Sequence, residues 1–256
     1  MLRQFWIAYL TITRKEIKRF TRIWVQTIVP PVIMVALYFV IFGNLIGQRI
    51  GEMDGMLYID FIMPGLVMMS IITNSYANVV SSFYGAKYSR HIEEMQVAPV
   101  PNLVILAGFV TGGVARGLSV GVAVTLVSLL FTDFSMHSPI LVLVVALLTS
   151  SLFAMAGLIN AIFANSFDDI SIVPTFVLTP LTYLGGIFYS IRLLPEFWQH
   201  VSLGNPILYM VNSFRFGFRG ASDIELSTAL LVILVFNVAL FAISLFLLER
   251  GIGTRQ

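Results

Sequence analysis

The chain has 256 residues, of which 58% are hydrophobic and only 11% charged, with a net charge of +2 and no cysteine. Soluble domains carry about 25% charged residues, so this composition excludes a single water-soluble core and predicts an all-α, polytopic membrane protein. The absence of cysteine also excludes disulfide frameworks and thiolate metal sites.

Residues 2–22 are predicted to form an amphipathic interfacial helix. Apolar and aromatic side chains between Leu2 and Trp24 fall on one helical face. The other side carries the cations Arg14, Lys15, Lys18, Arg19 and Arg22. This separation is typical of a helix that lies among lipid head groups and is attracted to anionic lipid. A basic flank that only sets the topology explains the same pattern.

Six apolar runs reach the ~20 residues that cross ~30 Å of hydrocarbon. They cover residues 23–46, 61–83, 103–131, 139–164, 170–189 and 226–248. In the first run, Pro30 and Pro31 should kink the helix or mark where the interfacial helix bends into the bilayer. With no repeat or soluble linker visible, residues 1–256 are predicted to form a single membrane domain.

An apolar segment at residues 207–218 lies just before the last run and is too short to cross. It contains Asn212 and Arg215, and Pro195, Gly204 and Pro206 break the chain around it. We therefore expect a re-entrant, extracytoplasmic helical insertion. If this segment crossed instead, the C-terminus would lie outside the cell.

Cations are distributed unevenly over this topology. With the N-terminus in the cytoplasm, ten lysines and arginines lie on the cytoplasmic side. The outer side holds four, Arg49, Arg192, Arg215 and Arg219, while Arg116 lies within a span. This asymmetry satisfies the positive-inside rule. We expect both termini in the cytoplasm.

The stretch from residue 90 to residue 101 carries too much charge for hydrocarbon and lies between two span-length runs. Arg90 is spaced to pair with Glu93 and Glu94 on one helical face, while Pro99 and Pro101 should end the helix. We predict a short surface helix at about residues 87–99 that faces water.

Polar side chains inside the predicted spans are candidates for a path or for contacts between helices. Arg116 lies near the centre of its run, where a cation costs about 2.5 to 3.5 kcal/mol on insertion scales. This cost indicates a polar partner or a wet cavity, although a helix that extends into the cytoplasm would let Arg116 snorkel. The other polar side chains are Asn74, Asn78, Thr175, Thr179 and Tyr183, which either line a path or hydrogen-bond between helices.

Glycines repeat at four-residue spacing in residues 103–131, at Gly108 and Gly112 and again at Gly113, Gly117 and Gly121. Such spacing lets another helix approach closely, and packing within the chain is favoured over a subunit interface. Residues 117–121 also match the G-x-S-x-G hydrolase motif, with Ser119 at its centre. That motif needs a strand-to-helix turn, so its place in a helical run argues against a hydrolase.

Asp168 and Asp169 begin the fifth predicted run and are expected to cap its helix, with contact to a cytoplasmic subunit as the alternative. The sequence contains no G-x-x-x-x-G-K-[ST] phosphate loop, so this chain does not bind ATP by that route. The three histidines are far apart in sequence, and no metal site is expected.

These features together resemble the permease subunit of a type-2 ABC exporter, in its small bacterial inner-membrane branch. The resemblance covers the whole chain and is sharpest at residues 23–38 (IWVQTIVPPVIMVALY), 93–101 (EEMQVAPVP) and 167–189 (FDDISIVPTFVLTPLTYLGGIFY). It implies that residues 87–99 are a coupling helix seated on an ATPase subunit. The coupling contacts would come from Arg90, His91, Glu93, Glu94, Met95, Gln96 and Pro99.

The resemblance also implies the partners. Two copies of this chain would pair with two separate ATP-binding subunits, which would hold ATP and magnesium, so this chain would have no cofactor and no enzymatic activity of its own. Membrane lipids, but no nucleic acid, are expected to contact it. The alternative function is a self-sufficient carrier or channel, against which the lack of a mid-membrane carboxylate in the spans counts. The sequence leaves the substrate and the dimer face open.

Overall fold

The computed structural model describes residues 2–132 and 136–253, without the side chains of residues 44 and 48. The long helices are α1 (Leu2–Arg22), α2 (Trp24–Tyr38), α4 (Tyr58–Tyr88), α6 (Asn102–Ser128), α7 (Pro139–Phe163) and α12 (Leu226–Arg250). The shorter helices are η1 (Phe39–Ile46), α3 (Gly47–Ile50), α5 (His91–Val97), α8 (Asp169–Val173), η2 (Pro174–Leu178), α9 (Thr179–Tyr183), η3 (Ile191–Leu193), α10 (Glu196–Leu203) and α11 (Pro206–Arg219). The two-residue strands β1 (Glu52–Met53) and β2 (Met56–Leu57) form a small antiparallel hairpin. The predicted all-α class is confirmed.

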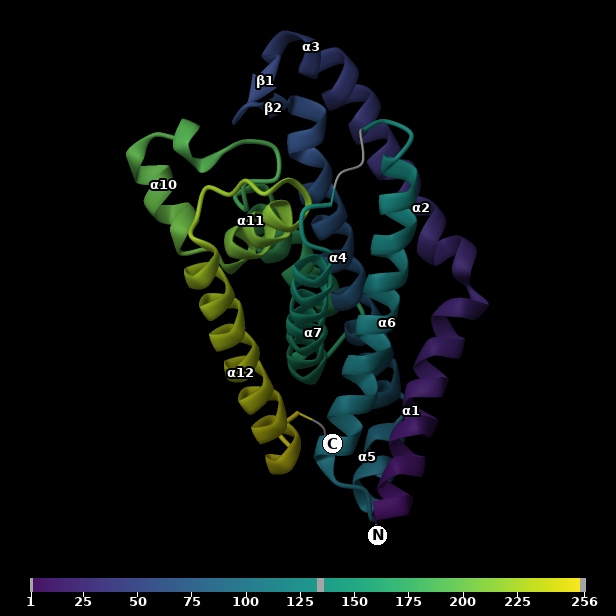
Figure 1. The fold of residues 1–256 in the computed structure, drawn as a ribbon. Helices are drawn as coiled ribbons and strands as arrows, with labels where there is room; N and C mark the ends of the chain where they lie inside the picture. Colours follow the sequence, from purple (N-terminus) through teal and green to yellow (C-terminus); the bar gives the residue numbers. More distant parts are fainter. Residues whose placement is uncertain (1, 133–135, 254–256) are drawn as a thin grey trace.

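The long helices run between two ends of the molecule (Figure 1). α1 begins and α12 ends at one end, beside α5, and we call this the termini end. The hairpin, α3 and α10 lie at the opposite end, which we call the far end. Within the described residues, five helices are long and apolar enough to cross a membrane: residues 24–43, 58–88, 102–128, 139–163 and 226–250.

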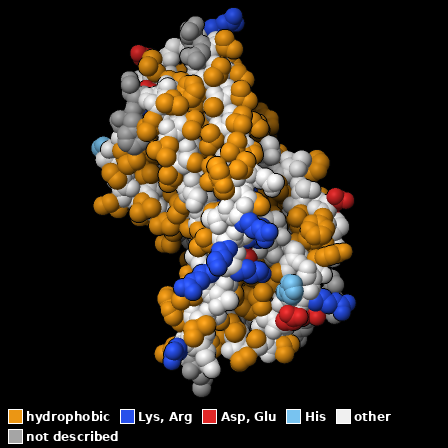
Figure 2. All heavy atoms as spheres, turned by 90° about the vertical axis from the view of Figure 1, so that its right-hand side faces the viewer, with side chains coloured by type: hydrophobic (Ala, Val, Ile, Leu, Met, Phe, Trp, Pro, Cys, Tyr) orange, Lys and Arg blue, Asp and Glu red, His pale blue; other side chains and the backbone are white. Residues whose placement is uncertain are grey.

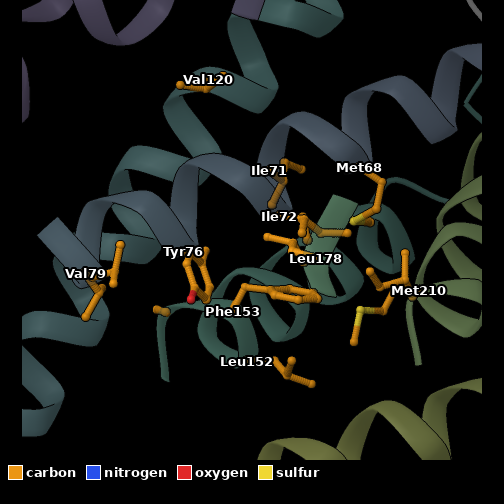
Figure 3. Close-up of a cluster of buried hydrophobic side chains, with 14 of the residues drawn as sticks. Met68, Ile71, Ile72, Tyr76, Val79, Val120, Leu152, Phe153, Leu178 and Met210 are labelled. Carbon is orange, nitrogen blue, oxygen red and sulfur yellow. The ribbon is translucent and has the colours of Figure 1, made fainter. Parts of the chain in front are cut away.

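α4 forms the centre of the bundle and packs against both α6 and α7. Its buried side chains include Ile72 and Tyr76, which meet Phe153 of α7 in one apolar cluster (Figure 3). Leu178 of η2 and Met210 of α11 reach the same cluster from the shorter helices. Helices far apart in the sequence therefore share one core around α4.

The glycines of α6 allow this close packing. A Cβ on Gly108 or Gly112 would overlap Ile12 or Glu16 of α1, whereas one on Gly117 would overlap Ser75 of α4. The two glycine rows thus face two different helices of the same chain. The predicted use of these glycines for packing within the chain is confirmed.

The fifth predicted span is shorter than expected. Residues 170–189 do not form one helix: α8, the π-helical turn η2 and α9 follow each other over 15 residues and end at Tyr183. Fifteen residues rise only about 22 Å, less than the ~30 Å of hydrocarbon. Pro174 and Pro180 interrupt the hydrogen-bond ladder, and Gly186 takes a positive φ of 70° just after the helix.

The other boundaries need smaller corrections. The break between α1 and α2 falls at Ile23 (φ −112°, ψ 36°), whereas α2 continues through Pro30 and Pro31. The segment before the last span consists of two short helices, α10 and α11, of 8 and 14 residues at the far end. Neither is long enough to cross, which agrees with a helical insertion in place of a span, while its re-entrant, extracytoplasmic position stays a prediction.

Candidate functional site

The predicted coupling helix is α5, and it is shorter than the predicted residues 87–99. Lys87 belongs to α4, Arg90 takes a left-handed conformation (φ 60°) between the two helices, and Pro99 lies beyond the helix. This sharp turn puts Arg90 outside the helix, so the helical spacing from which its pairing with Glu93 and Glu94 was predicted does not hold at Arg90. Arg90 therefore redirects the chain.

One side of this segment faces outward at the termini end, and we call it the α5 surface. It consists of Tyr88, Arg90, His91, Glu94, Val97 and Pro99, all exposed. Val97 is 87% exposed, whereas Ile92, on the opposite side of α5, is 1% exposed and anchors the helix in the core. Glu93, Met95 and Gln96 lie half-buried between these two sides. Two large apolar side chains of this surface, Tyr88 and Val97, therefore lie exposed among charged ones, where a partner protein could cover them.

Polar side chains tie the α5 region to the ends of two long helices. Gln96 of α5 and Asn102 of α6 both donate to the carbonyl of Leu248 near the end of α12, at 3.4 and 3.3 Å. Lys87 Nζ donates to the carbonyls of Ile162 and Ala164 at the end of α7, at 2.6 and 2.8 Å. The last carbonyls of a helix lack the usual backbone partner and are often satisfied by side chains in this way; the Leu248 carbonyl also accepts from the Gly251 amide at 3.2 Å. Gln96 thus links α5 directly to α12, and Lys87, in the last turn of α4 just before α5, links the same region to α7.

The loop before α8 lies beside the α5 surface. Phe167 contacts Tyr84 and Tyr88 of α4, with ring centroids 4.8 and 5.4 Å apart. Ser166, rather than Asp168, caps α8: its Oγ accepts from the Asp169 amide at 3.1 Å, and Asp169 accepts from the Ser166 amide at 3.1 Å. The Asn165 amide and the Ser166 hydroxyl lower the pKa of Asp169, so its carboxylate stays ionised. Exposed Asp168 is left facing outward.

α1 and α4 are joined by a buried carboxylate. Glu16 of α1 is 0% exposed, and its Oε1 accepts from Ser82 Oγ at 2.5 Å. Arg19 lies 3.4 Å from the other oxygen of Glu16 and donates to both the carbonyl and the side-chain Oδ1 of Asn78 at 2.8 Å. Arg19, predicted on the head-group face, thus turns toward α4. We call Glu16, Arg19, Asn74, Asn78, Ser82 and Arg116 the polar cluster.

Arg116 completes this cluster from α6. Its Nη2 donates to Asn74 Oδ1 at 3.3 Å, one turn from Asn78. The contacts between α1 and α6 show how deep Arg116 lies. Ile12 packs on Gly108 and Glu16 packs on Gly112, so the next turn of α6 places Arg116 near Arg19. At that level the cations of α1 end and the apolar helix α2 begins. Arg116 therefore lies near the edge of the apolar zone, with a polar partner.

The remaining α1 cations form a surface band. Arg14, Lys15, Lys18 and Arg22 are exposed, and Figure 2 shows a band of cationic side chains crossing this face below a large apolar area. The buried side of α1 is narrower than the predicted apolar face and includes Glu16, whereas Leu2 and Trp6 are exposed.

The polar residues of the fifth segment lie elsewhere. Thr175, Thr179 and Tyr183 are exposed on the short helices η2 and α9, and none of them joins the polar cluster. Tyr183 lies 3.4 Å, oxygen to oxygen, from Tyr38 of α2. Thr179 donates to the carbonyl of Pro174. These side chains mark a second face formed by α2 and α9.

A cluster at the far end was missed by sequence reasoning. Arg215, 2% exposed, stacks 3.8 Å from the Phe61 ring and donates to the carbonyl of Gly186 at 2.6 Å. Arg219 pairs with Asp60 of α4. A pocket of about 490 Å³ beside Arg215 is lined by Arg192 and by the carboxylates Asp54, Asp223 and Glu225. The arginines inside an apolar segment were the signal in the sequence, but their partners come from distant elements.

Known proteins resemble this chain in sequence. A family model described as ABC-2 type transporter matches residues 7–218. The inner membrane transport permease YadH of Escherichia coli (strain K12) is 60% identical over 256 residues, 100% of both chains. Nodulation protein J of Sinorhizobium fredii (strain NBRC 101917 / NGR234) is 24% identical over 206 residues, 80% of this chain and 79% of that protein. The resemblance drawn from the sequence is confirmed, and the chain belongs to the ABC-2 type transporter family, the membrane permease components of ABC transporters.

Proposed function

We propose that this chain is the permease subunit of a bacterial inner-membrane ABC exporter and that its α5 surface binds a separate ATP-binding subunit. The observation that carries the proposal is an exposed surface, with Glu94 and Val97 at its centre, on a helix that Gln96 fastens to α12 and that closely follows Lys87 of α4, which binds the end of α7. ATP and magnesium belong to the partner, so this chain contributes no catalytic group. The cargo in this proposal is a lipid-like, glycan or other hydrophobic substrate.

The proposed orientation places the termini end in the cytoplasm. It is supported by the cations of α1, which lie at the same end as α5 and would satisfy the positive-inside rule. The loop with Phe167 and Asp168 then forms a second cytoplasmic contact beside the α5 surface. The far-end insertion would cap the outer end of the path.

The active unit in this proposal is a homodimer with two ATP-binding subunits. The supporting feature is the face formed by α2 and α9, where Phe176 is 73% exposed and Thr175, Thr179 and Tyr183 add polar groups. A face that mixes apolar and hydroxyl groups suits a path shared by two copies more closely than a purely lipid-facing surface. ATP-driven movement of α5 would change the spacing of the two copies.

The test is copurification of the chain with its cognate ATP-binding subunit after mild solubilisation. We expect Glu94→Lys and Val97→Asp each to lower the recovered ATP-binding subunit at least tenfold, because a charge reversed or buried at a contact costs several kcal/mol. The matched control is Glu52→Lys, an exposed glutamate at the far end, which should leave recovery unchanged.

All three variants must reach the membrane and melt as the wild type does. Wild-type chain that recovers no ATP-binding subunit, or Glu94→Lys that behaves as Glu52→Lys, would contradict the proposed docking surface. Solute movement by the chain alone in liposomes, without ATP, would favour the carrier alternative instead.

A further inference from the structure

The pocket of about 490 Å³ beside Arg215 is lined by charges of both signs, and we call it the far-end pocket. Its charged lining residues are Asp54, Arg192, Arg215, Asp223 and Glu225. Among the described residues, no three acidic or histidine side chains lie close enough together to hold a metal ion. A pocket of this size with mixed charges therefore suits an organic ligand.

Two carboxylates of the far-end pocket are open to a cationic group. Asp54, at the turn of the β1–β2 hairpin, and Glu225, just before α12, are both exposed. Neither forms an ion pair with a described residue. The Glu225 carboxylate accepts from the hydroxyls of Ser227 and Thr228 within its own segment. A primary ammonium group, with three donors and a positive charge, matches such acceptors.

The opposite charge is also within reach of a ligand. Arg192 Nε lies 3.6 Å from Asp223 Oδ1, yet 69% of the Arg192 side chain is exposed. The guanidinium group is thus held at the pocket and still open to an anion, which it can bind in a forked geometry. Because an ion pair already positions this side chain, less conformational entropy is lost when a ligand binds.

Two buried charges lie beneath these exposed groups. Arg215 is 2% exposed, and only 3% of the Asp223 side chain is exposed. Arg215 Nη1 and Asp223 Oδ2 have no hydrogen-bond partner among the described residues. Both atoms are covered, so these side chains act on a ligand through their charge, which is screened less than that of exposed groups. A positive and a negative charge below the pocket favour a ligand that carries both signs.

The far-end pocket lies between the starts of two membrane-spanning helices. Phe61 belongs to the first turn of α4, and Leu226 is the first residue of α12. Farther along α12, Leu231 and Leu234 are 61% and 51% exposed. Lipid head groups meet hydrocarbon at the level where spans begin. The position therefore suits a molecule with a charged head in the pocket and apolar tails along α12.

We propose that the far-end pocket binds a lipid of the adjacent leaflet whose head group carries both a phosphate and a primary ammonium. The ammonium donates to Asp54 and Glu225, the phosphate accepts from Arg192, and the acyl chains leave along α12. An anionic lipid without the ammonium would bring its phosphate toward two carboxylates with nothing to balance them. The pocket thus selects a zwitterionic head group.

The experiment measures lipid binding to the purified full-length chain by native mass spectrometry. Dioctanoyl phosphatidylethanolamine is compared with dioctanoyl phosphatidylglycerol, which has the same tails and phosphate but no ammonium. Free phosphoethanolamine is added as a competitor. We expect phosphatidylethanolamine to bind at least tenfold more tightly than phosphatidylglycerol. Millimolar phosphoethanolamine should not displace it, because the acyl chains along α12 contribute to binding.

Variants test the two halves of the pocket separately. Asp54→Asn and Glu225→Gln should each weaken phosphatidylethanolamine binding at least fivefold without weakening phosphatidylglycerol binding, whereas Arg192→Gln should weaken both. The matched control is Glu52→Gln, an exposed glutamate of the same hairpin outside the pocket, with an expected change of less than twofold. Asparagine tolerates the positive φ of residue 54, and glutamine keeps an acceptor for Ser227, so both variants should fold.

Equal binding of the two lipids by the wild type would overturn recognition of the ammonium. If Asp54→Asn and Glu225→Gln both bound phosphatidylethanolamine as Glu52→Gln does, the preference would arise elsewhere and the pocket would be excluded as its site. Displacement by phosphoethanolamine would overturn the lipid assignment and leave a site for the free head group. The assay needs no ATP-binding subunit, so its outcome is independent of the proposed export function.

Discussion

Arginines of the termini end and of the far end are stabilised by different kinds of partner. At the far end, Arg215 is stacked on Phe61, Arg219 pairs with Asp60, and Arg192 pairs with Asp223 at 3.6 Å. In the polar cluster, Arg19 lies 3.4 Å from the carboxylate of Glu16 and donates to Asn78, whereas Arg116 donates to the side-chain oxygen of Asn74.

The far end is therefore held rigidly by its paired arginines, whereas the termini end keeps cations that are open to a partner. Paired and stacked cations join the far-end insertion to α4, whose own side chains Phe61 and Asp60 provide the contacts. Cations in excess, with donors unused, keep the termini end positive around α1.

The largest effect is expected when Arg215 at the far end is replaced. Arg215→Ala deletes a stack and two hydrogen bonds to carbonyls in a buried site, so the free energy of unfolding should fall by about 3 kcal/mol or more. Arg116→Ala, the matched arginine of the termini end, should cost less than about 1 kcal/mol. Melting curves of both variants in detergent measure the difference, and equal losses would break the comparison.

Lys87 is the one cation of the termini end that we expect to be structural. Lys87→Met keeps much of the side-chain volume but removes the donor to Ile162 and Ala164, which should cost about 1.5 to 3 kcal/mol. The control is Lys18→Met on the exposed side of α1, with an expected change within about 0.5 kcal/mol. Thermal unfolding checks both, and similar melting temperatures would argue against the cap.

Overfilling the contact between α6 and α4 tests the glycine row. Gly117→Ala places a methyl group against Ser75 and the carbonyl of Ile71 and should lower the free energy of unfolding by about 1 to 3 kcal/mol. Gly85→Ala in α4 meets open space and should raise it by up to about 1 kcal/mol. If both replacements changed the free energy of unfolding in the same direction, that result would contradict this packing.

A smaller effect is expected where α5 meets α12. Gln96→Ala removes one hydrogen bond to the carbonyl of Leu248, worth about 0.5 to 1.5 kcal/mol, while Asn102 still donates to it. Binding of the ATP-binding subunit should persist, and its ATP hydrolysis should respond less to added substrate. Loss of binding itself would show that Gln96 belongs to the docking surface.

The smallest effect is expected at Ser119, whose hydroxyl donates to the carbonyl of Ala115 within α6. Ser119→Ala should change stability by less than about 0.5 kcal/mol and leave transport intact. A loss of transport without a loss of folding would reopen a catalytic role for this serine.

Local patterns predicted the helices, because apolar run length and helical periodicity are properties of neighbouring residues. They placed α1, α4, α6, α7 and α12 close to their observed bounds. The fifth span came out shorter since its prolines act through backbone hydrogen bonds that hydropathy ignores.

Partners distant in sequence could not be predicted in the same way. No local pattern marks Glu16 within its basic helix, yet its carboxylate accepts a hydrogen bond from Ser82, 66 residues away. Lys87 was counted as a topology signal, although it caps a helix that ends 75 residues later. Arg90 was assigned an ion pair from spacing alone, but the spacing rule needs a helical backbone and Arg90 adopts a positive φ.

The most direct test of the account uses the absence of cysteine in this chain. Val97→Cys places a single thiol on the α5 surface, and Glu52→Cys places one on the far-end hairpin. In inside-out membrane vesicles, a membrane-impermeant maleimide should label Val97→Cys but not Glu52→Cys, and addition of the ATP-binding subunit should protect Val97→Cys. Labelling of Val97→Cys only from the outer side, or labelling that the ATP-binding subunit leaves unchanged, would contradict the assignment of α5 as its docking helix.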